Sequence, residues 1–183
     1  MTSSQPHDFI FKICLVGDAE VGKTSLVRRF VLDQFDGAYM LTIGAKVMKK
    51  TVTVQHEGKG VNVSLLIWDV MGQKNFKVVE SVALQNIVGG FVVCDITRKS
   101  TFESLEYWVD AIRNISPGIP IIILGNKSDL AVKAQITEAE LSEASKFLTS
   151  TSFMTSAKSG ENVELAFKRI AEYCLRGVPD GRD

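Results

Sequence analysis

Short apolar runs alternate with amphipathic segments along most of this chain. The apolar runs that predict strands occupy residues 9–16, 90–95 and 119–124, with a shorter one around Phe153 and Met154. Continuous apolar runs of this length are typical of strands that are covered on both faces of a parallel sheet. The hydrophobic pattern therefore predicts a buried and mostly parallel sheet.

One part of the pattern predicts an antiparallel pair of strands. Residues 46–55 and 61–69 are β-rich runs, and the sequence Glu57-Gly58-Lys59-Gly60 lies between them. A short loop that contains glycine between two such runs is typical of a β-hairpin. We therefore expect a six-stranded sheet in which one strand is antiparallel to the others.

Helical spacing is found between the predicted strands. Residues 25–32 form a helical pattern after the first strand, and the last helix has apolar side chains at Val163, Phe167, Ile170 and Cys174. The alternation of strands and helices predicts a single α/β domain with helices on both faces of the sheet. The expected boundaries are an N-terminal tail at 1–8, the domain at 9–176 and a C-terminal tail at 177–183.

Two capping boxes indicate where further helices begin. Ser100-x-x-Glu103 predicts a helix that continues to Ile115, and Thr137-x-x-Glu140 predicts one that continues to Leu148. Aromatic side chains at helical spacing are expected in the core, namely Phe102, Trp108, Phe147 and Phe167. The pair Lys49-Lys50 is expected on a solvated strand edge.

Composition limits the classes of function. The chain has 183 residues, the size of one ordinary domain, and its 21 Lys and Arg residues balance 21 Asp and Glu residues. With this balance, no net charge favours nucleic acid or an anionic membrane as a partner, and we expect no nucleic acid. Cys14, Cys94 and Cys174 lie in apolar segments, which predicts buried free thiols in a reducing compartment. No apolar run approaches the ~18 residues that a membrane span requires.

The sequence Gly-Asp-Ala-Glu-Val-Gly-Lys-Thr at residues 17–24 fits the phosphate-loop pattern G-x-x-x-x-G-K-[ST]. Gly17 and Gly22 let the backbone turn its N–H groups toward a phosphate chain, where the following helix adds its positive N-terminal end. Lys23 would then reach the terminal phosphates, and the Thr24 hydroxyl would coordinate magnesium. The alternative is a glycine-rich turn that binds nothing. The strand before the loop and the helix after it favour a nucleotide site.

A second motif, at residues 68–73, follows the third predicted strand. Asp69 could hold magnesium through a water molecule, as a Walker-B aspartate does. Gly72 leaves its backbone N–H free to approach a terminal phosphate. Gln73 could position a water for attack, because phosphoryl transfer depends on orientation more than on a strong base.

The third and fourth motifs indicate recognition of a purine base. In Asn126-Lys127-Ser128-Asp129, a carboxylate can accept from two N–H donors at once, and guanine offers such a pair where adenine does not. The stem of Lys127 can lie flat over the base. In Thr155-Ser156-Ala157-Lys158, the loop can offer a backbone N–H to a purine carbonyl oxygen.

These four motifs, in this order and each at the end of a predicted strand, resemble those of the Ras-superfamily small GTPases, most closely the Rab-like branch. The resemblance extends from Phe9 to Leu175. It implies the P-loop NTPase fold of a Ras-like G domain, which binds GTP and GDP with Mg²⁺ and hydrolyses GTP slowly. It also implies effectors, exchange factors and GTPase-activating proteins that bind through two switch segments, in Rab-like signalling or membrane trafficking.

The resemblance also implies roles for individual residues. Asn126 and Asp129 would select guanine, and Ala157 would donate its backbone N–H to the base oxygen. Phe35 matches the aromatic residue that packs edge-on to the base, although a simple core position is the alternative. The nucleotide-binding residues that we expect are Ala19, Glu20, Val21, Gly22, Lys23, Thr24, Ser25, Phe35, Tyr39, Thr42, Gly72, Asn126, Lys127, Asp129, Leu130, Ser156, Ala157 and Lys158.

The resemblance places the catalytic and metal-binding residues in the same region. Thr42, within Thr42-Ile43-Gly44, matches the switch I threonine that ligates magnesium only in the triphosphate state, and Tyr39 matches the tyrosine that closes over the phosphates. An ordinary exposed threonine and an inert glutamine are the alternatives for Thr42 and Gln73. The expected catalytic residues are Gln73, Lys23 and Thr42, and the expected metal ligands are Thr24, Thr42 and Asp69.

Several positions depart from the family pattern. Val70-Met71 stands where the family usually has Thr-Ala, and Ala19-Glu20 stands where many members have small residues or glycine. Residues 82–85 lack the Rab-type tyrosine pair. Residue 2 is threonine and the final five residues contain no cysteine, so we expect neither myristoylation nor prenylation of this chain. The alternatives are an unlipidated relative and a chain whose C-terminal tail has been trimmed.

We therefore expect a cytoplasmic, monomeric guanine-nucleotide switch that can reach membranes through partners. One alternative is an interaction module locked in one nucleotide state, which Met71 favours and which Gln73, Thr42 and Asp69 disfavour. A second alternative, an ATP-using P-loop enzyme, is disfavoured by Asp129.

Overall fold

A computed structural model describes residues 9–35, 45–70 and 83–178. Its strands are β1 (Phe9–Val16), β2 (Ala45–His56), β3 (Lys59–Val70), β4 (Gly89–Asp95), β5 (Ile121–Asn126) and β6 (Thr151–Thr155). Its helices are α1 (Lys23–Leu32), α3 (Lys99–Glu103), α4 (Leu105–Ile115), the 3₁₀ helix η1 (Ser128–Lys133), α5 (Glu138–Phe147) and α6 (Val163–Arg176).

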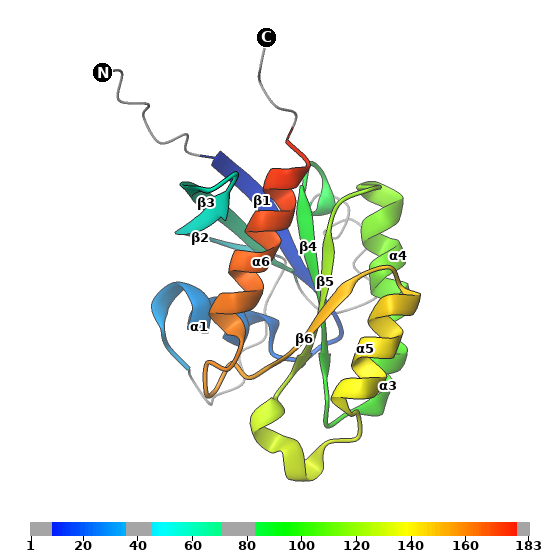
Figure 1. Cartoon of the computed structure of the whole chain (residues 1–183). Helices are drawn as coiled ribbons and strands as arrows, with labels where there is room; N and C mark the ends of the chain where they lie inside the picture. The colour runs from blue at the N-terminus through cyan, green and yellow to red at the C-terminus, as the bar shows by residue number, and fades with distance from the viewer. Residues whose placement is uncertain (1–8, 36–44, 71–82, 179–183) are drawn as a thin grey trace, which may run out of the picture.

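The six strands form one sheet in the order β2-β3-β1-β4-β5-β6. Only β2 is antiparallel to its neighbour, and all other pairs are parallel. Helices α1 and α6 lie on one side of this sheet, and α3, α4 and α5 lie on the other (Figure 1). The prediction of a six-stranded, mostly parallel sheet with helices on both faces is therefore confirmed.

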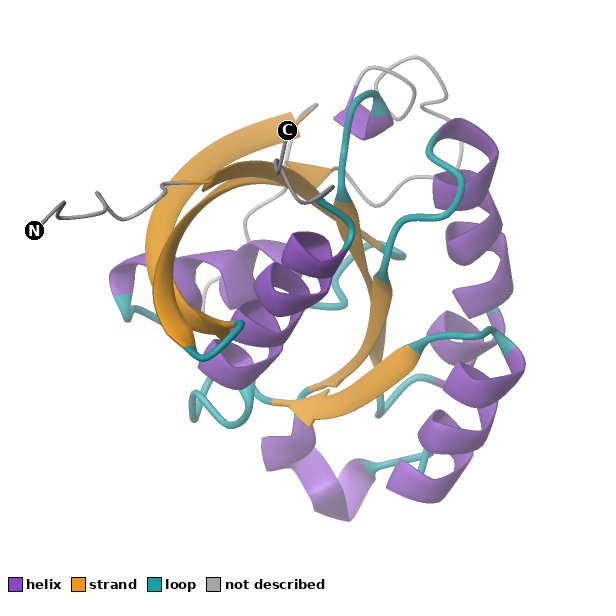
Figure 2. Ribbon diagram, turned by 45° about the horizontal axis from the view of Figure 1, so that its top comes forward, coloured by secondary structure: helices purple, strands orange, loops and turns teal. Residues whose placement is uncertain are grey.

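Alternating side chains of β1 supply two separate cores. Ile13 and Leu15 pack in the cluster that includes Phe30 of α1 and Phe167 of α6, whose rings stack with their centroids 4.0 Å apart. Cys14 and Val16 point the other way, into the cluster that contains Trp108. Successive side chains of a strand point to opposite faces, so a strand that is apolar throughout contributes side chains to the core on each face of the sheet. Figure 2 shows the helices on the two sides of the sheet.

The hairpin is tighter than its sequence predicted. Strand β3 begins at Lys59, so the loop contains only Glu57 and Gly58 instead of four residues. Both residues have positive φ, 49° and 76°, as the favoured two-residue hairpin turn requires. Lys59 pairs with His56 directly.

The capping box at Ser100 was a wrong prediction, whereas that at Thr137 is confirmed. Thr137 and Glu140 cap α5 reciprocally. Helix α3 instead begins at Lys99, and Ser100 is its second residue. The earlier start follows from Asp95, whose carboxylate accepts hydrogen bonds from the backbone and hydroxyl of Thr97 and so turns the chain before Ser100. The expected single helix is also divided at Ser104 into α3 and α4.

Two surface predictions also need correction. Phe147, expected in the core, is 79% exposed, because it lies about 200° around the axis of α5 from the buried Ser145. Lys49 is exposed on the edge strand β2, as expected, but Lys50 is only partly exposed. Its ammonium donates to the backbone oxygen of Phe30 over 2.5 Å, lies over the Phe30 ring and pairs with Glu164 at 3.6 Å.

The other core predictions are confirmed. Trp108 and Phe167 are buried, Phe102 packs against the second cluster, and the three cysteines are buried free thiols. Burial raises the pKa of Cys14, Cys94 and Cys174 to about 12, so none of the three is a thiolate at neutral pH. Within the described ranges, no helix is long and apolar enough to cross a membrane.

Candidate nucleotide-binding site

The motifs predicted from the sequence meet at the carboxyl edge of the parallel strands. The phosphate loop follows β1, Asp69 is next to the last residue of β3, and Asn126 and Thr155 end β5 and β6. A fourth polar side chain, Asp95, ends β4 at the same edge. Ligands of open α/β sheets bind at this edge, outside the carboxyl ends of the strands.

The phosphate loop needs its two glycines for space as well as for conformation. Gly17 and Gly22 have φ of 143° and 98°, which L side chains rarely adopt. A Cβ atom on Gly17 would lie 2.2 Å from the carbonyl oxygen of Val93, and one on Gly22 would lie 2.3 Å from Nδ2 of Asn126. The loop is therefore packed against β4 and β5. Helix α1 begins directly after it, so its positive N-terminal end faces the loop.

Lys23 is held inside the loop as a buried cation. Its Nζ donates to the backbone oxygens of Gly17 and Asp18, each over 2.8 Å, and the residue is only 6% exposed. Burial lowers the pKa of Lys23 to about 8, although the charges of Asp69 and Asp18 act in the opposite direction. An anionic phosphate beside this ammonium would compensate the charge that burial disfavours.

Thr24 and Asp69 supply oxygen ligands suited to magnesium. The Thr24 hydroxyl donates to Oδ2 of Asp69 over 2.5 Å, although the two residues are 45 positions apart in the chain. Mg²⁺ prefers hard oxygen ligands and is usually held by one or two protein groups together with substrate phosphates. This donor pair beside Lys23 therefore fits the expected metal. The third predicted ligand, Thr42, lies outside the described residues.

The base-recognition loops are joined by Asn126. Its Nδ2 donates to the backbone oxygen of Val21 over 2.9 Å, and its Oδ1 accepts from the backbone N–H of Ala157 over 3.2 Å. The phosphate loop and the Ser156–Lys158 loop thus share one side chain. A purine oxygen would have to share the Ala157 N–H with Asn126.

Asp129 is oriented at the surface of the site. Asp129 is exposed, and its Oδ1 accepts a hydrogen bond from the Ser156 hydroxyl over 2.6 Å. Exposure leaves the carboxylate accessible to a ligand, while the Ser156 contact fixes its direction. Arg29 of α1 supports the same region by donating to the backbone oxygens of Ala157 and Lys158, at 2.8 and 2.7 Å.

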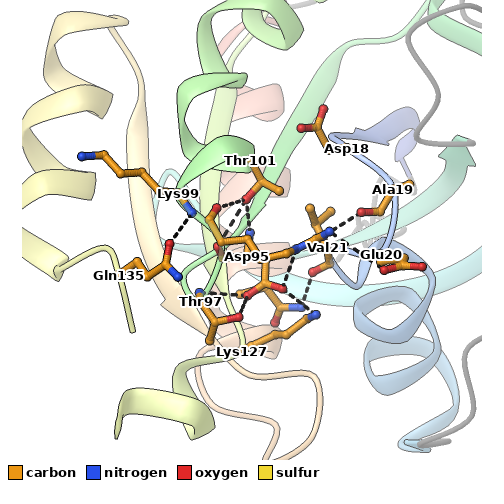
Figure 3. A network of polar contacts seen from close by, with 12 residues as sticks. Asp18, Ala19, Glu20, Val21, Asp95, Thr97, Lys99, Thr101, Lys127 and Gln135 are labelled. Carbon is orange, nitrogen blue, oxygen red and sulfur yellow. Dashed lines mark hydrogen bonds and ion pairs between the residues drawn. The ribbon is translucent and has the colours of Figure 1, made fainter. Parts of the chain in front are cut away.

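Lys127 contacts a residue that the motifs did not include. Its Nζ lies 2.6 Å from Oδ2 of Asp95, which is 1% exposed. Burial opposes ionisation of Asp95, but the hydrogen bonds from Lys127 and Thr97 outweigh it and lower the pKa of this carboxyl. Figure 3 shows Asp95 between Lys127 and the phosphate-loop residues 18–21.

Sequence reasoning missed Asp95, Arg98 and Arg29. Asp95 could have been found, because it is an acidic residue at the carboxyl end of an apolar strand, the same signal that identified Asp69. The two arginines carried no such signal. Arg98 donates to the backbone oxygen of Ala19, 79 positions away in the chain, and Arg29 donates to that of Ala157, 128 positions away.

Of the remaining predicted residues, some are described by the structure and the others are not. Phe35 is 41% exposed just beyond α1, so the alternative of a core position is wrong. Ala19, Glu20, Val21, Ser25 and Leu130 lie in the phosphate loop, in α1 or in η1, as their motifs require. Tyr39, Thr42, Met71, Gly72 and Gln73 lie outside the described residues.

The sheet order and the motifs at its carboxyl edge define the class: this is a P-loop GTPase domain. The Ras family model matches residues 12–176. Ras-related protein Rab-13 of Canis lupus familiaris is 35% identical over 173 residues, which cover 94% of this chain and 83% of the relative. Ras-related protein Rab-11A of Dictyostelium discoideum is 36% identical over 169 residues, or 92% and 77% of the two chains. The chain therefore belongs to the Ras family and is a Rab-like small GTPase.

Proposed function

We propose that this protein is a guanine-nucleotide switch that binds GTP and GDP with Mg²⁺, hydrolyses GTP slowly and recruits effectors only in the GTP state. The contact between Ser156 and Asp129 carries the proposal, because it orients an exposed carboxylate at the edge of the site that Asn126 links to the phosphate loop. A carboxylate can accept both N–H donors of guanine. The Lys127 stem, fixed by Asp95, would lie over the base.

In this proposal the predicted site residues that the structure describes hold the nucleotide. Lys23 and the backbone N–H groups of residues 19–25 bind the phosphates, while Thr24 and Asp69 hold the metal. The ion that these two residues would hold would supply positive charge against the negative charge of the terminal phosphates. Phe35 would contact the edge of the base, and Leu130 and Lys158 would complete its surroundings.

We propose roles in hydrolysis and switching for residues whose motifs resemble those of the family. Gln73 would orient the attacking water, and Thr42 and Gly72 would be held by the γ-phosphate until hydrolysis releases their segments. Effectors, exchange factors and GTPase-activating proteins would bind these switch segments, with Tyr39 closing over the phosphates. We propose a cytoplasmic monomer that acts in Rab-like trafficking or signalling.

Single-turnover GTP hydrolysis tests this proposal against a module locked in one nucleotide state. Protein loaded with GTP is mixed with Mg²⁺, and the fraction of GDP is followed with time. The family's alanine leaves room for Gly72 and Gln73 to approach the phosphate, whereas Met71 is larger and flexible. Because a misplacement of ~1 Å can cost about a hundredfold, Met71→Ala should accelerate hydrolysis by roughly tenfold.

Two glutamine variants provide the control for that measurement. Gln73→Leu should slow hydrolysis in both the wild-type and the Met71→Ala background, while Gln85→Leu, at an exposed position, should not. A wild-type protein that binds GTP but converts none of it would support the locked module instead. A Met71→Ala rate at or below that of the wild type would show that Met71 does not limit hydrolysis.

A further inference from the structure

Arg98 connects the phosphate loop to the end of β4. Its Nη2 donates to the backbone oxygen of Ala19 over 2.7 Å, and its Nε donates to Oδ2 of Asp95 over 3.2 Å. Its Nη1 also lies 3.9 Å from Oε2 of Glu20. The guanidinium therefore spans two elements that are far apart in the chain, at the residues that we assign to phosphate binding.

The same carboxylate oxygen also anchors the base-recognition loop. Oδ2 of Asp95 lies 2.6 Å from Nζ of Lys127, so two cations from different loops share it. Its other oxygen, Oδ1, accepts from the backbone N–H and the hydroxyl of Thr97, at 2.9 and 2.7 Å. Asp95 is thus fixed on both sides and buried, which makes it a rigid anchor.

Arg98 suits this position better than a lysine would. A guanidinium donates in several directions from one rigid plane, whereas an ammonium is a point charge on a flexible stem. Here one nitrogen binds Asp95 while another binds Ala19. The contact with Glu20 is longer and half exposed, so it adds little.

We propose that Arg98 is a positioning residue that retains the bound nucleotide, by tying the phosphate loop to the carboxylate that also anchors Lys127. A nucleotide can leave only if the loop around its phosphates loosens. With Arg98 in place, such loosening breaks the contact with Ala19 and disturbs the anchor of the base loop as well. This inference rests on the proposed function, because it requires a guanine nucleotide in the site.

Nucleotide dissociation provides the test. Protein loaded with a fluorescent GDP analogue is mixed with excess GDP in Mg²⁺, and the loss of fluorescence gives the dissociation rate. Arg98→Ala should dissociate about tenfold faster than the wild type, the factor expected for one charge-assisted hydrogen bond. Arg98→Lys should lie between the two. Circular dichroism verifies that each variant is folded.

Arg169→Ala is a matched control. Arg169 is 39% exposed and Arg98 is 38% exposed, and each pairs with a carboxylate three residues away. The partner of Arg169 is Glu172, and both lie on α6 rather than at the candidate site. This variant should release nucleotide at the wild-type rate.

A double-mutant cycle separates the proposed link from a merely structural role. If Asp95 couples the two loops, Arg98→Ala should accelerate dissociation less in a Lys127→Ala background than in the wild type, so that the effects are not additive. Fully additive effects, or an Arg98→Ala rate equal to that of the wild type, would overturn the proposal. A wild-type protein that binds no guanine nucleotide would instead contradict the proposed function itself.

Discussion

The indole of Trp108 donates a hydrogen bond from Nε1 to Oδ1 of Asp18 over 2.8 Å, which joins helix α4 to the phosphate loop. Trp108 is 1% exposed, and its ring packs in the core between α4 and the sheet. One side chain therefore contributes both to the core and, through the carboxylate of Asp18, to the phosphate loop of the candidate site. Changes in the packing of α4 should therefore alter the position of the phosphate loop.

Replacement of Trp108 by phenylalanine should destabilise the protein. The substitution keeps an aromatic ring but removes the hydrogen bond and leaves part of the indole volume empty. The expected loss is about 2 kcal/mol, measured by urea denaturation with saturating Mg²⁺ and GDP. Trp68→Phe, at a partly exposed position on β3, should cost less. A loss for Trp108→Phe no larger than that for Trp68→Phe would contradict the combined role of Trp108 in the core and in the contact with Asp18.

Asp129→Asn should change the choice of base. An amide in place of the carboxylate can no longer accept two hydrogen bonds from guanine, but it can donate to the extra carbonyl oxygen of xanthine. Sites built to pair a specific polar group discriminate by factors of up to ~10⁴ to 10⁵. We expect GDP affinity to fall sharply and xanthosine diphosphate to bind, as measured by competition. Asp110→Asn, on the exposed side of α4, is the control. An unchanged guanine preference would refute the role of Asp129.

Thr24→Asn should weaken the binding of GTP more than that of GDP. The Thr24 hydroxyl contacts the Asp69 carboxylate, and these two groups would hold magnesium, whose charge would stabilise the additional phosphate of GTP. Affinities for both nucleotides should be compared in excess Mg²⁺ and after chelation. Chelation should also reduce the difference between the variant and the wild type. Equal losses for the two nucleotides in excess magnesium would argue against Thr24 as a ligand.

The stability that Asp95 contributes should depend on pH. Its pKa in the folded protein is lowered from its ordinary value of 3.8, with burial opposing the shift and hydrogen bonds from Lys127 and Thr97 producing it. A lowered carboxyl pKa stabilises the fold above pH 3.8, and the contribution is lost as the pH falls through the folded value. Asp95→Asn should therefore be less stable than the wild type at pH 7 in urea denaturation. The difference between the two proteins should shrink below pH 3.8. A difference that is the same at all pH values would contradict the paired, ionised state of Asp95.

The strands and the ligand-binding edge could be predicted because their signals are local. An apolar run followed by a polar motif indicates a buried strand and the residue at its end, and this held for Asp69, Asn126 and Thr155. The buried face of α6 followed from its spacing in the same way.

The errors come from contacts between distant parts of the chain or from helix ends. Ser100 has the sequence of a helix cap, but the turn built on Asp95 starts the helix before it. Phe147 stands on the last turn of α5, where no neighbouring element covers it among the described residues. The roles of Arg98 and Trp108 depend on backbone and side-chain partners 79 and 90 positions away, which no local pattern reveals.

Mass spectrometry of the nucleotide that co-purifies with the protein shows directly whether the chain binds a guanine nucleotide. The protein is purified in Mg²⁺ without added nucleotide, denatured, and the released small molecules are identified and quantified against the protein. We expect close to one guanine nucleotide per chain, GDP with or without GTP, and its loss when magnesium is chelated during purification. An adenine nucleotide in that position, or no nucleotide from a folded protein that also fails to bind added GDP, would contradict this expectation.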